Sequence, residues 1–250
     1  MSEKPNYGNW VSARLILAPG VLGIALGILS FFIPLLFILA LILIACSVYF
    51  AYARYQFSSR GGDVQTKIQE LVFDYLKWDG DGEALDIGCG NGPLTLCLAK
   101  KYSTAKATGI DYWGSSWEYS IKVCEKNAQI EKVSKRVFFQ QASAAKLPFE
   151  DGAFDAVISN LTFHEVRDVK DKQELVREAL RVVKKGGKFA FQDLFLWKAV
   201  YGSVDDLLTA IKSWGIEQVE FVDTSGSKFI PGALKLPFMV GTIGIIYGQK

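Results

Sequence analysis

A glycine-rich segment gives the clearest chemical signal in this chain of 250 residues. The segment reads Leu85-Asp86-Ile87-Gly88-Cys89-Gly90-Asn91-Gly92 and lies between a strand-like run and a helix-like run. Glycine at three alternate positions lets the backbone approach a ligand closely, because no Cβ atom intervenes. The spacing alone is a weak signal, since many glycines only form turns and nucleotide-binding dehydrogenases carry similar loops.

A second acidic residue, Asp111, ends the next strand-like run about 20 residues further on. A carboxylate at this place can accept both hydrogen bonds from a ribose diol. Capping of the following helix is the plainer explanation of the same residue. Both interpretations stay open at the level of this pattern.

Polar side chains after two later strand-like runs are candidates for the reacting side of a site. Asn160 and His164 follow one run, and Asp193 follows another. A histidine at such an edge can remove a proton near neutral pH, although a structural histidine explains the residue equally well. We take Asn160 and His164 as candidate catalytic residues and Asp193 as a further pocket candidate.

The elements that must position these residues alternate between strands and helices. Strand-like runs cover 83–87, 106–110, 136–140, 153–159 and 187–192, with helix-like runs at 94–101, 115–128 and 171–184 between them. This alternation predicts parallel strands with right-handed crossovers and a ligand crevice at their carboxyl ends. A helix that Asp63 caps precedes them, and another at 205–214 follows.

Two final strand-like runs, 217–223 and 239–248, have only a loop between them and should pair antiparallel. The predicted fold is therefore α/β, a doubly wound and mainly parallel seven-stranded sheet with an antiparallel terminal hairpin.

Four further segments follow the glycine turn and Asp111 in a fixed order. They are Lys126-Asn127-Ala128, Arg136-Val137-Phe138-Phe139, the run from Leu147 to Asp155, and the run from Arg181 to Lys188. This order resembles the class I S-adenosylmethionine-dependent methyltransferases over residues 63–250. The terminal hairpin fits that family too.

The resemblance implies S-adenosylmethionine as the cofactor and assigns residues to its parts. Asp86, Gly88, Cys89, Gly90 and Gly92 would hold the methionine part, Asp111 the ribose, and the segment around Ser143 and Ala144 the adenine, with Tyr112 and Asn160 also at the site. Tyr112 would flank the adenine or simply pack. Relatives usually have an acidic residue where Ser143 stands, so Ser143 would accept a hydrogen bond from the adenine more weakly.

An uncharged, apolar stretch at residues 15–53 is too long for one membrane span, which needs about 20 residues. Pro34 divides it, and we predict a hairpin of transmembrane helices at 15–29 and 35–53. Gly20, Gly23 and Gly27 would let the two helices approach closely. Arg14 and Arg54 flank the stretch, so both ends should face the cytoplasm.

The predicted organisation is a membrane anchor at 1–55, a linker at 56–62 and a methyltransferase domain at 63–250 that faces the cytoplasm from the cytoplasmic membrane. A removed signal peptide, or a lipid-modification signal at Leu43-Ile44-Ala45-Cys46, would instead export the domain. The apolar stretch is much longer than a signal core of about 7 to 15 residues, so we favour the anchor.

Composition narrows the partners. Lysine and arginine (28) nearly balance aspartate and glutamate (26), which gives no sign of a nucleic-acid groove. Four cysteines without CxxC pairs and a single histidine predict neither a disulfide framework nor a metal site.

These features predict a membrane-anchored methyltransferase that acts on a small-molecule acceptor. The anchor favours lipophilic acceptors such as quinones or lipids, although a tethered enzyme can also use soluble ones. Two alternatives stay open. One is a non-catalytic module that binds the cofactor at the membrane, and the other is a nicotinamide-dependent oxidoreductase, which leaves the run from Leu147 to Asp155 and the terminal hairpin unexplained.

Overall fold

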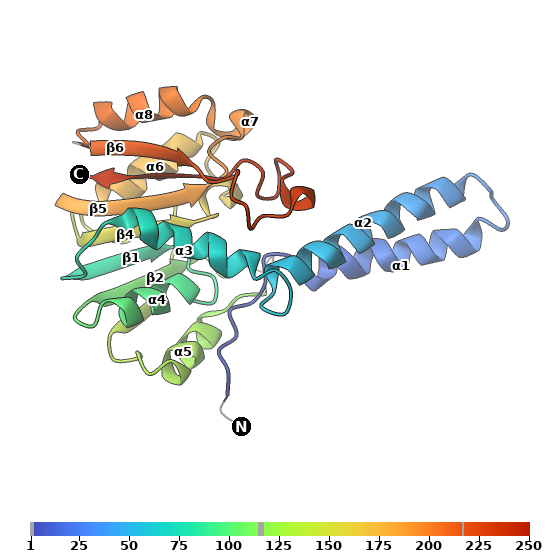
Figure 1. Cartoon of the computed structure of the whole chain (residues 1–250), viewed down its shortest axis with the longest axis horizontal. Helices are drawn as coiled ribbons and strands as arrows, with labels where there is room; N and C mark the ends of the chain where they lie inside the picture. The colour runs from blue at the N-terminus through green and yellow to red at the C-terminus, as the bar shows by residue number, and fades with distance from the viewer. Residues whose placement is uncertain (1–2, 115–117, 217) are drawn as a thin grey trace. The chain divides into compact units, whose positions relative to one another are not determined.

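The computed structural model describes residues 3–114, 118–216 and 218–250 and divides the chain into two compact units. One unit is Asn9–Ile68, which is helical, and the other is Met1–Gly8 with Gln69–Lys250, which is α/β. Figure 1 shows both units, with labels on most helices and strands.

The helical unit is built on a hairpin of α1 (Ala13–Leu29) and α2 (Leu36–Phe57). The break around Pro34 is where the sequence predicted it, and both predicted helices are present. That they span a membrane stays a prediction. The two helices approach closely at the glycines, because a Cβ atom on Gly23 would lie 2.9 Å from the Ile44 side chain. Ser47 Oγ also donates to the carbonyl of Ile16 at 2.8 Å.

Most large apolar side chains of this hairpin are exposed, including Phe31 and Phe32 at its turn. By length and composition α2 is able to cross a membrane, whereas α1 is apolar but shorter. The helix α2 runs through Phe57, so the first two residues of the predicted linker are helical.

The α/β unit contains one seven-stranded sheet in the order β3-β2-β1-β4-β5-β7-β6. The strands are β1 (Glu83–Ile87), β2 (Lys106–Asp111), β3 (Val137–Gln141), β4 (Phe154–Asn160), β5 (Val183–Asp193), β6 (Gln218–Asp223) and β7 (Gly244–Gln249). β1 to β5 are parallel, and β7 lies antiparallel between β5 and β6. The predicted mainly parallel sheet with an antiparallel terminal hairpin is confirmed.

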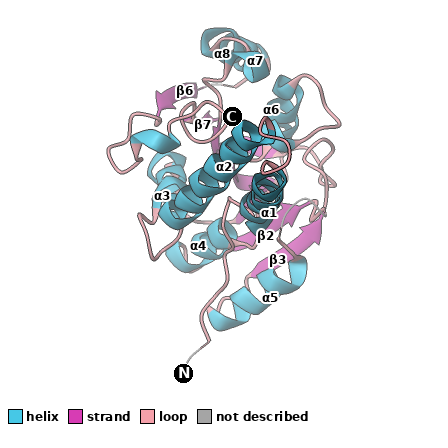
Figure 2. Ribbon diagram, turned by 90° about the vertical axis from the view of Figure 1, so that its right-hand side faces the viewer, coloured by secondary structure: helices cyan, strands magenta, loops and turns pink. Residues whose placement is uncertain are grey.

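Helices cover both faces of this sheet (Figure 2). They are α3 (Val64–Leu76), α4 (Pro93–Lys101), α5 (Ile121–Ile130), α6 (Lys172–Arg181), α7 (Lys198–Tyr201) and α8 (Val204–Ser213), with short 3-10 turns η1 (Phe163–Glu165) and η2 (Gly232–Leu234). The helix α3 crosses the boundary of the two units, since Gln69 begins the α/β part.

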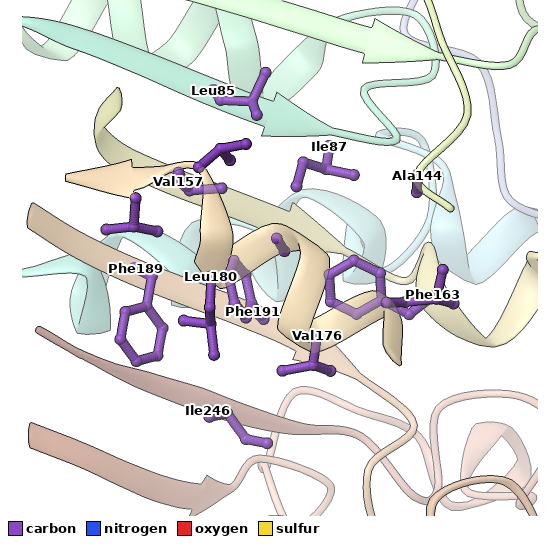
Figure 3. Close-up of a cluster of buried hydrophobic side chains, with 14 of the residues drawn as sticks. Leu85, Ile87, Ala144, Val157, Phe163, Val176, Leu180, Phe189, Phe191 and Ile246 are labelled. Carbon is purple, nitrogen blue, oxygen red and sulfur yellow. The ribbon is translucent and has the colours of Figure 1, made fainter. Parts of the chain in front are cut away.

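The core follows the alternation of the strands. On one face of the sheet, larger residues such as Leu85, Val157 and Phe189 pack against α6. Figure 3 shows them in one cluster with Val176 and Leu180 of that helix. The neighbouring strand positions hold mainly small side chains on the opposite face, which packs against α4. They are Ala84, Ala107, Ala156 and Ala190. This period of two fixes both the register and the face of each strand.

Several predicted boundaries are wrong. The helix predicted at 171–184 ends at Arg181, and β5 begins at Val183, because Val183 pairs with Phe154 in the sheet. The last strand starts at Gly244 rather than 239 because η2 and the turns after it occupy the preceding loop.

The helix predicted from 115 begins at Ile121, where the Ser120 hydroxyl accepts from Val123 N. Ser115, Trp117 and Glu217, which fall within the predicted runs 115–128 and 217–223, lie outside the described residues. Asp63 stands directly before α3: its carbonyl accepts from Lys67 N at 3.1 Å, and its carboxylate accepts from the Thr66 hydroxyl at 2.8 Å.

Candidate cofactor site at the carboxyl edge of the sheet

The glycine turn joins β1 to α4 and is shaped by left-handed backbone. Gly88, Gly90 and Gly92 have φ of +75°, +57° and +82°. A Cβ atom on Gly88 would lie 2.0 Å from Thr162 Oγ1, so glycine is required where this turn meets the loop after β4. Gly92 precedes Pro93, which occupies the first turn of α4.

The turn is held to β2 by its own amides. Gly88 N and Cys89 N both donate to the carbonyl of Ile110, at 2.8 and 2.9 Å. The Cys89 side chain is buried, and burial raises the pKa of its thiol. Cys89, which was predicted to contact the cofactor, therefore has both its amide and its thiol directed into the protein.

Asp111, at the end of β2, also binds the glycine turn. Its Oδ2 accepts from Gly90 N at 2.9 Å and its Oδ1 accepts from Trp113 N at 2.8 Å. Burial raises the pKa of Asp111, and these backbone bonds oppose the rise. Since Ser120 caps α5, Asp111 is not its helix cap. Each oxygen keeps a second acceptor position, which suits a ribose diol.

Asp86 is buried beneath the turn. Its Oδ2 accepts from Thr95 Oγ1 at 2.6 Å. Burial raises the pKa of Asp86 to about 7, although the hydrogen bonds from Thr95 act in the opposite direction. A cationic ligand group close to Asp86 would favour the ionised carboxylate.

The predicted adenine segment follows β3. Ala142 N donates to the carbonyl of Asp111 at 3.0 Å, which places this segment beside the end of β2. The Ser143 hydroxyl accepts from Ala145 N at 3.2 Å, and Ala144 is buried in the core. Tyr112 is 67% exposed and does not pack into the core.

Asn160 ends β4 next to β1, where Ser159 pairs with Ile87. Its side-chain oxygen is buried and has no hydrogen-bond partner among residues 3–114, 118–216 and 218–250. Buried acceptors are normally paired, so an orphan at the carboxyl edge indicates a place for a ligand donor. Together with Asp86 and Asp111 it forms a set of acceptors that fits the ammonium group and ribose hydroxyls of S-adenosylmethionine.

Asp193, at the end of β5, organises the loop after β4. Its buried carboxylate accepts hydrogen bonds from Thr162 N (3.1 Å), Phe163 N (2.8 Å), Leu194 N (2.7 Å) and His164 Nδ1 (2.6 Å). Although burial opposes it, the His164 charge and these bonds hold the pKa of Asp193 below its usual range. Asp193 thus joins the ends of β4 and β5.

His164 is held between two carboxylates. Its Nδ1 faces Asp193, and its Nε2 lies 3.4 Å from Glu165 Oε1. Burial alone would lower the pKa of His164, but the two carboxylates raise it to about 10. The ring is therefore charged near neutral pH, so this geometry favours a positioning role over the proton abstraction that the sequence suggested. The sequence offered Asp193 only as a pocket candidate and gave no role to Glu165.

Comparison with known proteins addresses the chemistry of this edge. Residues 85–191 match the family model described as "Methyltransferase domain". The chain is 30% identical over 134 residues to a 27-O-demethylrifamycin SV methyltransferase of Amycolatopsis mediterranei, which covers 54% of the chain and 46% of that relative. It is 28% identical over 148 residues to the chloroplastic 2-phytyl-1,4-beta-naphthoquinone methyltransferase of Arabidopsis thaliana, which covers 58% of the chain and 52% of that relative.

A solved structure shares the fold. The geranyl diphosphate C-methyltransferase of Streptomyces coelicolor, solved with S-adenosyl-L-homocysteine, matches with a TM-score of 0.57 and 17% identity over 75% of this chain and 79% of that one. The chain spans about half the length of the curated relatives it matches. Over residues 85–191 the α/β unit is thus similar to methyltransferase domains, and it shares their fold.

Proposed function

We propose that this chain is a membrane-anchored enzyme that transfers a methyl group from S-adenosylmethionine to a lipophilic small-molecule acceptor. The observation that carries the proposal is the acceptor set at one edge of the sheet: Asp86, Asp111 and the orphan oxygen of Asn160 around the glycine turn. The matches to methyltransferases support the reaction, and they favour it over a nicotinamide-dependent oxidoreductase.

When bound, S-adenosylmethionine supplies a methyl group on a positively charged sulfur, which a nucleophile displaces in line. The residues of this chain then have to orient the two reactants and exclude water. Asp86 and Asn160 would hold the ammonium group, and Asp111 the ribose. Ser143 would accept from the adenine, but its hydroxyl already accepts from Ala145 N, so this contact is the weakest of the set.

The acceptor side lies at the loop that Asp193 holds. Methyl transfer needs a base only where the acceptor reaches the site protonated. A charged His164 between Asp193 and Glu165 cannot serve as that base without first losing its own proton. We therefore propose that these three side chains fix the conformation of the loop from Thr162 to Glu165. This assignment favours acceptors that reach the site already deprotonated, or whose attacking atom carries no proton.

The membrane part of the proposal rests on the helical unit. A contiguous apolar surface of this kind is unfavourable in contact with water and is typical of a membrane-contacting segment. Arg14 and Arg54 flank it. We propose that α1 and α2 enter the cytoplasmic membrane, that residues 1–55 are the anchor, 56–62 the linker and 63–250 the domain, and that this domain faces the cytoplasm. A quinone methyltransferase among the relatives supports a lipophilic acceptor.

The test uses the full chain in lipid nanodiscs. Calorimetry should show binding of S-adenosylmethionine, and Asp111→Ala should weaken it at least about tenfold, because a buried acceptor pair is lost. The control is Asp74→Ala, which removes an exposed carboxylate from α3. Transfer of a labelled methyl group to a demethylated quinone in the same discs would then support the acceptor class.

Three results would count against the proposal in different ways. Binding without transfer to any acceptor from membrane extracts would favour the non-catalytic module. Binding of a nicotinamide cofactor in place of S-adenosylmethionine would favour the oxidoreductase. Transfer only to water-soluble acceptors would keep the reaction and remove the lipophilic acceptor.

A further inference from the structure

A short N-terminal segment lies against the α/β unit far from its neighbours in sequence. Residues 3–8, here called the N-terminal strap, belong to this unit, and Asn9 begins the other. The strap has no regular secondary structure. Its contacts are made with α5 and with the glycine turn.

Asn127 of α5 binds the strap through both ends of its side-chain amide. Its Oδ1 accepts from Asn6 N at 2.8 Å, and its Nδ2 donates to the carbonyl of Asn6 at 2.9 Å. The same Nδ2 donates to the carbonyl of Asn91 at 3.0 Å. Asn127 is only 1% exposed, so the strap and the glycine turn supply the partners that a buried amide requires.

Asn91 links the strap and α5 to the glycine turn of the cofactor site. It lies between Gly90 and Gly92 and is buried, and its Oδ1 accepts from Ser120 N at 3.1 Å. Gly8 of the strap lies against it, because a Cβ atom on Gly8 would be 3.3 Å from Asn91 Nδ2. The same added Cβ would lie 2.7 Å from the Tyr119 ring.

Tyr119 also faces the turn itself. A Cβ atom built on Gly90 would lie 3.5 Å from its ring. One ring therefore touches both the strap and the glycine whose amide binds Asp111.

Two further contacts hold the strap in place. The Tyr7 hydroxyl donates to Glu131 Oε1 at 2.9 Å, and Lys100 binds the other oxygen of that carboxylate at 2.6 Å. Glu3 forms an ion pair with Lys126. The strap is thus attached at Glu3, Asn6, Tyr7 and Gly8, over its whole length.

We propose that the N-terminal strap is part of the cofactor site and that Asn127 is a positioning residue. Through Asn127 and Tyr119 the docked strap would hold Gly90 and Asn91 in the conformation that accepts S-adenosylmethionine. Release of the strap would leave the buried Asn127 oxygen without its partner and free the turn to move. The proposal rests on the cofactor assignment and adds a dependence of cofactor affinity on residues 3–8.

The first test is Gly8→Ala in the full chain. Gly8 has φ of +74°, and the added methyl group would collide with the Tyr119 ring, so the strap should leave its place. We expect the Kd for S-adenosylmethionine, measured by calorimetry in nanodiscs, to rise about tenfold. The control is Gly215→Ala, which has a similar φ of +84° but nothing within 4 Å of the added Cβ. Its Kd should stay unchanged.

A second test measures the mobility of the glycine turn in the absence of the cofactor. Asn6→Pro removes the amide that donates to Asn127. Hydrogen exchange of residues 88–92 and 121–130 should then be faster than in the wild type, while β4 and β5 keep their protection. Gly215→Ala again serves as the control.

The outcomes separate the two proposals. Failure of the wild type to bind S-adenosylmethionine or its demethylated product would overturn the cofactor assignment, and the exchange experiment would still decide on the strap. Wild-type affinity and wild-type exchange of the turn in both strap variants would overturn the role of the strap.

Discussion

At the scale of single residues, the central feature is His164 between Asp193 and Glu165. This is the one histidine of the chain, so its ring gives an unambiguous NMR signal in protein without a histidine tag. We expect it to titrate near pH 10, far above the usual 6.5, because the two carboxylates hold its proton. Asp193→Asn should bring the pKa down, and Glu165→Gln should do so less, since its oxygen is farther away at 3.4 Å. A wild-type ring that titrates near 6.5 would contradict the assignment.

The same ring affects stability in a defined pH window. The folded state binds the His164 proton more tightly than the unfolded state, so its contribution is full below about pH 6.5 and is lost as the pH rises toward 10. Asp86, whose pKa is raised to about 7, stabilises the folded state at a pH below its ordinary pKa of 3.8. This stabilisation is lost as the pH rises through 7. Urea unfolding of His164→Gln should be less pH-dependent than that of the wild type between pH 7 and 10.

At the scale of elements, the alternation of strands and helices could be read from the sequence, because the strand residues alternate between the two faces of the sheet. The boundaries were less predictable. Val182-Val183 continued a helical pattern of apolar residues, and only the pairing of Val183 with Phe154 assigns it to a strand. Such a partner lies outside any local window.

The helical hairpin offers a prediction at this scale. Gly23→Val should destabilise the packing of α1 on α2 by about 1 to 3 kcal/mol, because its Cβ would lie 2.9 Å from Ile44 and 3.2 Å from the carbonyl of Ala40. Gly27→Val is the matched control, since its Cβ meets only Ala40 at 3.9 Å. Thermal unfolding in one detergent compares them, and equal melting temperatures would speak against close packing at Gly23.

At the scale of the whole molecule, the candidate site was predictable where local motifs carry it and not where distant segments meet. The glycine turn and Asp111 have a recognisable spacing, and the structure brings them into hydrogen-bond contact. The bond between Asn6 and Asn127 joins residues 121 positions apart and leaves no pattern in either segment. The charge on His164 was also hidden, because it depends on Asp193 from another strand.

Membrane topology is a prediction for the molecule as a whole. A cysteine in place of Phe32, which is exposed at the hairpin turn, should react with a membrane-impermeant maleimide added outside intact cells. A cysteine in place of the exposed Lys228 should react only after lysis. Reaction of both before lysis would favour export, and reaction of neither would show that the hairpin does not cross the membrane.

The position of β7 has a consequence for the order in which the sheet can be completed. β6 is synthesised before β7, yet β6 pairs with β7, and β7 alone joins it to β5. During translation β6 therefore has no strand to pair with until residues 244–249 have left the ribosome. A stop codon or a cleavage before Gly244 would remove one strand and leave two edges exposed, which makes such fragments candidates for aggregation and rapid degradation.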